Sequence, residues 1–318
     1  MKQTMNQDLY FHHYPSSPFA EKIRAIFGYK NLAWKSVHQP MVMPKDDLVA
    51  LTGGYRRIPV LQMGDQIICD TMLICDVLEH LSSDKTLYPA GLKGISRTVA
   101  QWADTMLFPV AMAFNFQPAG AQHVFKDAPP EALKVFGADR QAMRGGALRM
   151  HPADAAASYK SYLRRISSML DGQSFLLGNQ PSVADFATYH PLWFTRRIAV
   201  PVASILDATP NVLAWMDRIE ALGHGQIGKS SATESIANCA HSIRASELFG
   251  VENTFQDEHG IALGSSVVIR AESFGLEETA GELVAATRTR YTLRRMDEKA
   301  GEVFVHFPRI GFVLKKAE

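Results

Sequence analysis

The sequence predicts an α/β domain at the N-terminus, an all-α helical domain after it, and a small β-barrel-like domain at the C-terminus. Three observations predict this order. The first ninety residues alternate strand and helix signals, residues 95–222 show helical periodicity, and short β-like runs follow residue 245. The length of 318 residues also favours two or three domains over one. We place the domain boundaries at 1–84, 92–240 and 245–318.

The N-terminal domain is predicted to have the order β-α-β-α-β-β-α. Its first helix starts with Pro18, because the missing proline N–H costs nothing at the first helical position. Gly64-Asp65 reads as a tight turn between two strands, and Asp70 is a favourable cap for the last helix. The expected strands are 9–12, 33–37, 58–63 and 66–69, and the expected helices are 19–27, 44–51 and 71–81.

The second and third domains differ in their periodicity. Apolar residues at helical spacing predict several helices with short connections, which is typical of a helical domain. The run from Pro118 to Pro130 is expected to be a loop. The expected helices are 102–114, 133–148, 152–170, 182–194 and 212–222. The expected C-terminal strands, close together and separated by Gly, Asp and Pro, are 267–269, 283–287, 291–294, 303–307 and 312–314.

Composition argues against several classes of protein. A formal net charge of +1 gives no general attraction to nucleic acid or to an anionic membrane. No apolar run approaches the roughly 20 residues of a membrane span, and the first ten residues lack the apolar stretch of a secretory signal. Cys69, Cys75 and Cys239 show no CxxC spacing and are typical of reduced, buried thiols. We therefore expect a cytoplasmic protein with no membrane or nucleic-acid partner.

Four motifs carry the functional argument. They are the segment 14–24 (YPSSPFAEKIR), the segment 57–61 (RIPVL), the pair Asp70-Thr71 after the hairpin, and the segment 182–185 (SVAD). In this order and spacing they resemble the cytosolic glutathione transferases with a serine-type, somewhat tau-like active-site turn. The resemblance covers about the first two-thirds of the chain. It implies a thioredoxin-like N-terminal domain, glutathione as co-substrate, and a homodimer.

The resemblance implies a role for the serine that directly precedes Pro-Phe, because in serine-type members that residue faces the glutathione sulfur. Ser17 matches this position best, and its neighbour Ser16 stays open. The physics agrees, since a helix N-terminus favours a thiolate and a serine O–H can donate to it. The alternative is that Ser16 only caps the helix.

The same resemblance implies the residues that hold the peptide. Ile58 precedes a cis Pro59 and pairs with the backbone of the glutathione cysteine. Asp70 takes the γ-glutamyl ammonium, and Thr71, where many members have serine, takes its carboxylate at a helix start. The other implied glutathione-binding residues are Phe19, Arg57 and Lys45, with His38 as the alternative to Lys45 for the glycine carboxylate.

Four other sequence features have simpler structural interpretations. Ser182 and Asp185 form a helix-capping element with a role in folding. Gly223–Ser230 fits a P-loop pattern, but a helix precedes it where a P-loop needs a strand, so we disfavour nucleotide binding. His12-His13 point to opposite faces of a strand and do not predict a metal site. Aromatic and methionine side chains at helical spacing favour core over a second-substrate pocket: Trp102, Met106, Phe108, Phe114 and Phe116.

The predicted function is therefore a transferase that activates the glutathione thiol for attack on a small hydrophobic electrophile, or a related isomerase or lyase reaction. Serine rather than cysteine at the turn favours thioether chemistry, because serine forms no mixed disulfide. The alternative is a non-catalytic binding or scaffold protein whose C-terminal domain mediates interactions. The extra C-terminal domain motivates this alternative, since typical relatives end near the last helix of the second domain.

Overall fold

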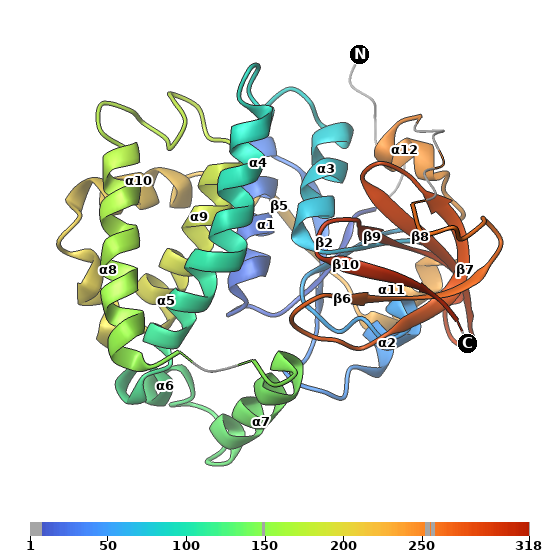
Figure 1. Ribbon diagram of the computed structural model, residues 1–318, viewed down its shortest axis with the longest axis horizontal. Coiled ribbons are helices and arrows are strands. Elements are labelled where there is room, and N and C mark those ends of the chain that lie inside the picture. The colour runs from blue at the N-terminus through green and yellow to red at the C-terminus, as the bar shows by residue number, and fades with distance from the viewer. Residues whose placement is uncertain (1–7, 148–149, 252–254, 256–257, 318) are drawn as a thin grey trace.

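The computed structural model describes residues 8–147, 150–251, 255 and 258–317. Within these residues the strands form a ten-stranded sheet, and most helices form a second layer beside it (Figure 1). The thioredoxin-like domain, the helical domain and the strand-rich C-terminal region are all present, as predicted. No described helix is long and apolar enough to cross a membrane.

The N-terminal elements follow the predicted order. β1 pairs with β2 in parallel and with β3 in antiparallel orientation, and the Gly64-Asp65 turn joins β3 to β4. Their bounds are β1 Tyr10–His13, α1 Pro18–Lys30, β2 Ala33–His38, α2 Asp46–Thr52, β3 Val60–Met63, β4 Gln66–Cys69 and α3 Thr71–Leu81.

The C-terminal strands extend this same sheet. β9 pairs in parallel with β4, so that Ile67 lies opposite Val305, and the strand order is β10-β6-β7-β8-β9-β4-β3-β1-β2-β5. The edge of β4 thus has its backbone groups paired, which an open edge would leave unsatisfied. The bounds are β6 Ser266–Ala271, β7 Thr279–Ala286, β8 Arg290–Asp297, β9 Gly301–Pro308 and β10 Phe312–Lys316.

The C-terminal strands also cover α2. Leu48 and Leu51 of α2 share an apolar core with buried side chains such as Leu283 of β7 and Val303 of β9. Arg295 donates to the carbonyl oxygen of Ala50, 3.2 Å away, and so satisfies one of the free acceptors at the end of α2. The third region is therefore folded onto the first.

The helical domain has the expected helices, with one correction. The segment from 118 to 130, expected to be a loop, begins with a helix, because Pro118 occupies a first helical position that suits proline. α4, η1 and α5 form one continuous helix with a π-helical turn in its middle. The bounds are α4 Lys93–Trp102, η1 Ala103–Leu107, α5 Phe108–Asn115, α6 Pro118–Val124, α7 Ala132–Arg144, α8 Pro152–Met169, α9 Val183–Trp193, η2 Phe194–Ile198, η3 Val200–Leu206 and α10 Pro210–Glu220.

The chain returns to the sheet after α10. β5 (Gln226–Lys229) pairs in parallel with β2, α11 (Ala232–Asn238) packs on α2, and α12 (Ala245–Phe249) packs on α3. The helix start at Ser231 is a capping box with Glu234.

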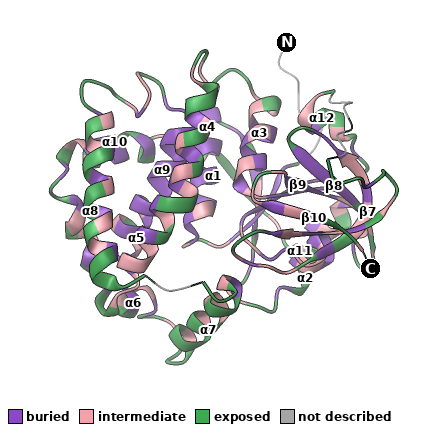
Figure 2. Ribbon diagram, viewed as in Figure 1, coloured by how far each residue is buried: buried purple, intermediate pink, exposed green. Residues whose placement is uncertain are grey.

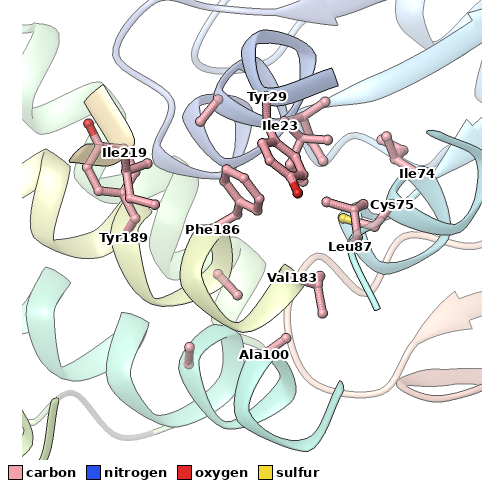
Figure 3. Close-up of a cluster of buried hydrophobic side chains, with 14 of the residues drawn as sticks. Ile23, Tyr29, Ile74, Cys75, Leu87, Ala100, Val183, Phe186, Tyr189 and Ile219 are labelled. Carbon is pink, nitrogen blue, oxygen red and sulfur yellow. The ribbon is translucent and has the colours of Figure 1, made fainter. Parts of the chain in front are cut away.

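One apolar core joins the α/β domain to the helical domain. Figure 3 shows Tyr29 of α1 against Phe186 of α9, with Cys75 of α3 beside them, and the two rings lie 5.6 Å apart. The outer faces of α7 and α8 are largely exposed (Figure 2). In α9, the capping residue Asp185 accepts from Trp215 Nε1 at 3.0 Å, so its carboxylate is structural.

Candidate functional site

The candidate site begins at the N-terminus of α1. Ser17 is the helix cap, and its hydroxyl accepts from the backbone N–H of Ala20 at 3.2 Å. The alternative that Ser16 caps the helix is therefore wrong, because the helix begins one residue later. Ser16 is half-buried, and its hydroxyl lies 3.6 Å from the sulfur of Met41. A capping hydroxyl that accepts one hydrogen bond still has its own proton to donate.

Arg24 of α1 stabilises the turn that precedes this helix. Its guanidinium donates to the carbonyl oxygen of Pro15 at 2.8 Å and pairs with Glu21 at 2.8 Å. It also contacts Nδ1 of His13 at 3.0 Å. Burial and then this guanidinium lower the pKa of His13 to about 3, so the ring is a neutral part of the scaffold.

The second element of the site is the start of α3. Asp70 has φ 72° and ψ 137°, a backbone conformation that residues other than glycine rarely adopt. Its carboxylate accepts a hydrogen bond from Met72 N–H at 2.9 Å. The hydroxyl of Thr71 accepts from Lys22 Nζ at 3.1 Å. Backbone strain of this kind is concentrated at functional sites.

Lys22 is a residue that the sequence reasoning missed. It is 1% exposed and donates to Asp104 at 2.6 Å, and Asp104 in turn lies 3.0 Å from His190 Nε2. Burial alone would raise the pKa of the Asp104 carboxyl, yet the ammonium of Lys22 and the hydrogen bond from His190 lower it. This buried network ties α1 and α3 to the helical domain.

The third element is the segment before β3. The Ile58-Pro59 bond is cis, which confirms that expectation. Arg57 lies 3.8 Å from the carboxylate of Asp70, so two of the predicted residues are neighbours. Its neighbour Arg56, which the sequence reasoning did not select, is buried and pairs with Asp139 of α7 at 2.6 Å.

The remaining predicted residues lie around these elements. Lys45 is buried at the start of α2 and donates to the carbonyl oxygen of Arg56 at 3.1 Å. Burial, followed by nearby Arg140, lowers the pKa of Lys45 to about 8. His38, its alternative, is exposed at the end of β2. The ring of Phe19 lies 4.6 Å from that of Phe108, so it faces the helical domain.

Comparison with known proteins agrees with this geometry. Residues 11–86 match the model of the glutathione S-transferase N-terminal domain, and residues 147–218 match that of the C-terminal domain. A crystal structure of a GST-like protein from Pseudomonas syringae is 36% identical, with a TM-score of 0.79, and the match covers 98% of this chain and 99% of that one. The chain belongs to the glutathione S-transferase family. No curated protein matches it.

More distant solved structures show a shared fold alone. A tau class enzyme from mango (Mangifera indica) is 17% identical, with a TM-score of 0.50, over 67% of this chain and 89% of that one. A β-etherase from Sphingobium sp. strain SYK-6 is 20% identical, with a TM-score of 0.51, over 67% and 95%. Both cover about two-thirds of the chain, whereas the Pseudomonas protein covers nearly all of it.

An apolar cavity, partly open to solvent, lies beside the α1 turn. It has a volume of about 240 Å³ and lies between the β2–α2 loop and α7. Met41, which contacts Ser16, is one of its walls. The full lining is Met41, Val42, Phe125, Pro129, Glu131, Ala132, Val135 and Phe136. Of the α4–α5 stripe, Trp102 and Phe114 pack against the core, as expected, whereas Met106 is 53% exposed and is not part of it. Phe116 stacks on Phe136 of the cavity wall.

The two disfavoured motifs lie in ordinary structural surroundings within the described residues. The P-loop-like segment contains β5, an exposed edge strand that follows α10. His12 contacts Gln62 at 2.9 Å, and His13 contacts Ser36 at 2.8 Å. Across the described ranges, no three His, Cys, Asp or Glu side chains gather as a metal site would require.

Proposed function

We propose that this protein binds glutathione and activates its thiol for attack on a small hydrophobic electrophile. One observation carries the proposal: the turn at Ser16 and Ser17, the cis bond before Pro59 and the Asp70-Thr71 helix start occur together in one domain. Two contacts link these elements: Lys22 joins α1 to Thr71, and Arg57 joins the segment before β3 to Asp70.

The proposed chemistry is thiolate substitution. The O–H of Ser17, with Ser16 as its alternative, donates to the glutathione sulfur, and the positive end of α1 further lowers the thiol pKa. The sulfur forms a bond to the electrophilic carbon, and the leaving group departs with the electron pair of the broken bond. The thiol proton passes to solvent. Holding both reactants together supplies much of the rate.

Each end of the peptide has proposed partners. The γ-glutamyl ammonium binds Asp70, and its carboxylate binds the Thr71 hydroxyl and the N–H groups at the start of α3. The cysteine backbone pairs with Ile58 next to Pro59. Phe19, Arg57 and Lys45 complete the glutathione site, with Lys45 at the glycine end.

The proposed place for the electrophile is the apolar cavity beside Ser16. Its walls are mostly aliphatic and aromatic, which favours an apolar ligand, and Met41 connects it to the turn. The related isomerase or lyase reactions use the same thiolate, so they belong to the same proposal. We further propose that the protein is cytoplasmic and forms a homodimer. Sedimentation analysis of the purified chain measures the oligomeric state directly.

The first test is glutathione binding by titration calorimetry, followed by turnover with chlorodinitrobenzene. Ser17→Ala should keep glutathione affinity within a few-fold and lower kcat by about 100-fold, an effect typical of losing one transition-state hydrogen-bond donor. Ser16→Ala is the matched control and should retain turnover. Loss of turnover in Ser16→Ala alone would move the role to Ser16. Absence of any glutathione binding would favour the non-catalytic scaffold.

A further inference from the structure

The C-terminal region reaches the candidate glutathione site through two of its parts. One is the connection between β6 and β7, residues 272–278, and the other is Phe312 at the start of β10. We call these together the C-terminal clamp. In Figure 1 the orange and red strands β6, β7 and β10 lie close to α2.

Arg57 is held by both parts of the clamp. Its guanidinium donates to the carbonyl oxygen of Phe274, and its central carbon lies 5.6 Å from the centre of the Phe312 ring. The third neighbour is Asp70, at 3.8 Å. The Arg57 side chain, only 23% exposed, is thus fixed by a carbonyl oxygen, an aromatic ring and a carboxylate, each from a different segment of the chain.

Arg56 contacts the clamp at Glu277, whose charge also acts on Lys45. One carboxylate oxygen of Glu277 lies 2.5 Å from Nε of Arg56. The charged groups facing Lys45 are Arg56, Glu277 and, from α7, Asp139 and Arg140. Glu277 is therefore one of two anions that offset three cations at this end of the site.

The clamp is packed tightly against its surroundings. Gly275 has φ 65° and donates its N–H to the carbonyl oxygen of Met143 at 2.8 Å. A Cβ added to Gly54 would lie 2.2 Å from the carbonyl oxygen of Glu278, so no side chain fits between the two backbones. Thr279, directly after the clamp, donates to Thr52 O at 3.1 Å.

From these contacts we propose that the C-terminal clamp is a positioning device of the glutathione site, in which Phe274 and Phe312 orient Arg57, and Glu277 orients Arg56. The proposal rests on glutathione being the ligand. It gives the third region a role inside the binding site, in place of a separate interaction module. An arginine side chain that is already ordered loses less conformational entropy when the ligand binds, and this favours binding.

The test compares four variants of the full chain by calorimetric titration with glutathione. Glu277→Gln removes a 38% exposed side-chain charge at the site, and Glu282→Gln removes a similarly exposed charge on β7, away from it. Phe312→Leu removes the ring beneath Arg57. Phe307→Leu removes its buried neighbour, whose ring lies 5.5 Å from that of Phe312.

We expect the two clamp variants to raise the glutathione Kd and KM by roughly fivefold, a size consistent with losing one partly exposed cation–π or ion-pair contact. At saturating glutathione, kcat should stay within about twofold of the natural protein, because the thiolate partners are untouched. The two control variants should bind glutathione normally, although Phe307→Leu should lower Tm at least as much as Phe312→Leu.

The pH dependence of ligand affinity is a further measurement, and a purely structural role of Glu277 would leave it unchanged. S-methylglutathione is the probe, because it keeps the peptide and lacks the ionisable thiol. Glu277→Gln removes an anion that supports the ammonium of Lys45, so its affinity for the probe should begin to fall at a lower pH than in the natural protein. The charges of Arg56, Asp139 and Arg140 stay in place in both proteins.

The outcomes separate the two proposals. If the natural protein binds neither glutathione nor its S-methyl form, the proposed function and the clamp proposal both fail. If it binds glutathione and the clamp variants bind equally well, the clamp proposal alone is overturned. Equal losses in the clamp variants and their controls would also overturn it, because the effect would then follow general destabilisation.

Discussion

At the scale of single residues, Asp70 combines two tasks that can be separated. Its carboxylate caps α3 through Met72 N–H, and it is also the proposed partner of the γ-glutamyl ammonium. Its positive φ costs about 1–3 kcal/mol in a residue other than glycine. The strain persists because the hairpin on one side and α3 on the other fix the backbone.

Asp70→Asn is expected to separate the two tasks. The amide oxygen can still cap α3, and asparagine tolerates positive φ, so Tm should change little. Glutathione affinity should fall by about tenfold or more, because the ammonium loses its charged partner. Thermal unfolding and calorimetry of the same sample measure both. Unchanged affinity would remove Asp70 from the site.

At the scale of elements, the buried charge of Lys22 and the partly buried charge of Asp104 connect α1 to η1. Lys22 also donates to Thr71, so three elements depend on one ammonium group. A lysine in a helix normally lies on the exposed face, and for this reason its burial was not foreseen. Its spacing, three residues after Phe19 and four before Ile26, was the available signal, because residues so spaced share one face of a helix.

Lys22→Met is expected to destabilise the protein by about 3–5 kcal/mol, because it leaves the charge of Asp104, only 18% exposed, without its main partner. The double variant Lys22→Met/Asp104→Leu should recover much of this loss, since two apolar side chains replace the pair. Urea unfolding of the two single variants and the double variant gives the coupling energy. Simple additivity would show that the pair contributes nothing as a unit.

Helices and caps were the parts of the fold that sequence predicted well. The helix starts at Pro18 and Ser231 depend on neighbours within four residues, so local chemistry fixes them. The pairing of β9 with β4 joins residues about 240 positions apart, and the alternation of a strand does not identify its partner. The strands were therefore foreseen, while their continuity with the first sheet was not.

The site shows the same division. Ser17, Asp70 and Thr71 lie in short motifs, and the resemblance is what proposes them as site residues. Phe274 and Glu277 lie in a connection without any pattern, and contacts between residues more than 200 positions apart bring that connection to Arg57 and its neighbours. Long-range pairing of this kind is invisible to periodicity.

At the scale of the whole molecule, buried histidines decide how the protein responds to acid. His12 is 1% exposed, and burial lowers its pKa to about 4, although Gln62 opposes the change. Burial likewise lowers the pKa of His13 to about 3 and that of His306 well below its usual range. His306 is also the residue that joins β9 to Gln66 of β4, at 2.8 Å.

These pKa values set the sign of the pH dependence. The unfolded chain binds protons at these histidines below about pH 6.5, while the folded protein does not until pH approaches the lowered values. The stability is therefore fully present above pH 6.5 and is lost as pH falls toward about 4. Each histidine contributes a slope of at most about 1.4 kcal/mol per pH unit in this window.

Urea unfolding at about pH 8, 6.5 and 5 should thus show little change over the first interval and a steep loss over the second. His306→Gln is the diagnostic variant, because glutamine can keep a hydrogen bond to Gln66 but takes up no proton. It should reduce the slope below pH 6.5 by about one proton. A slope that is the same in the natural protein and in His306→Gln would mean that His306 binds a proton in the folded state, and that burial at the junction of the two strand sets does not exclude its charge.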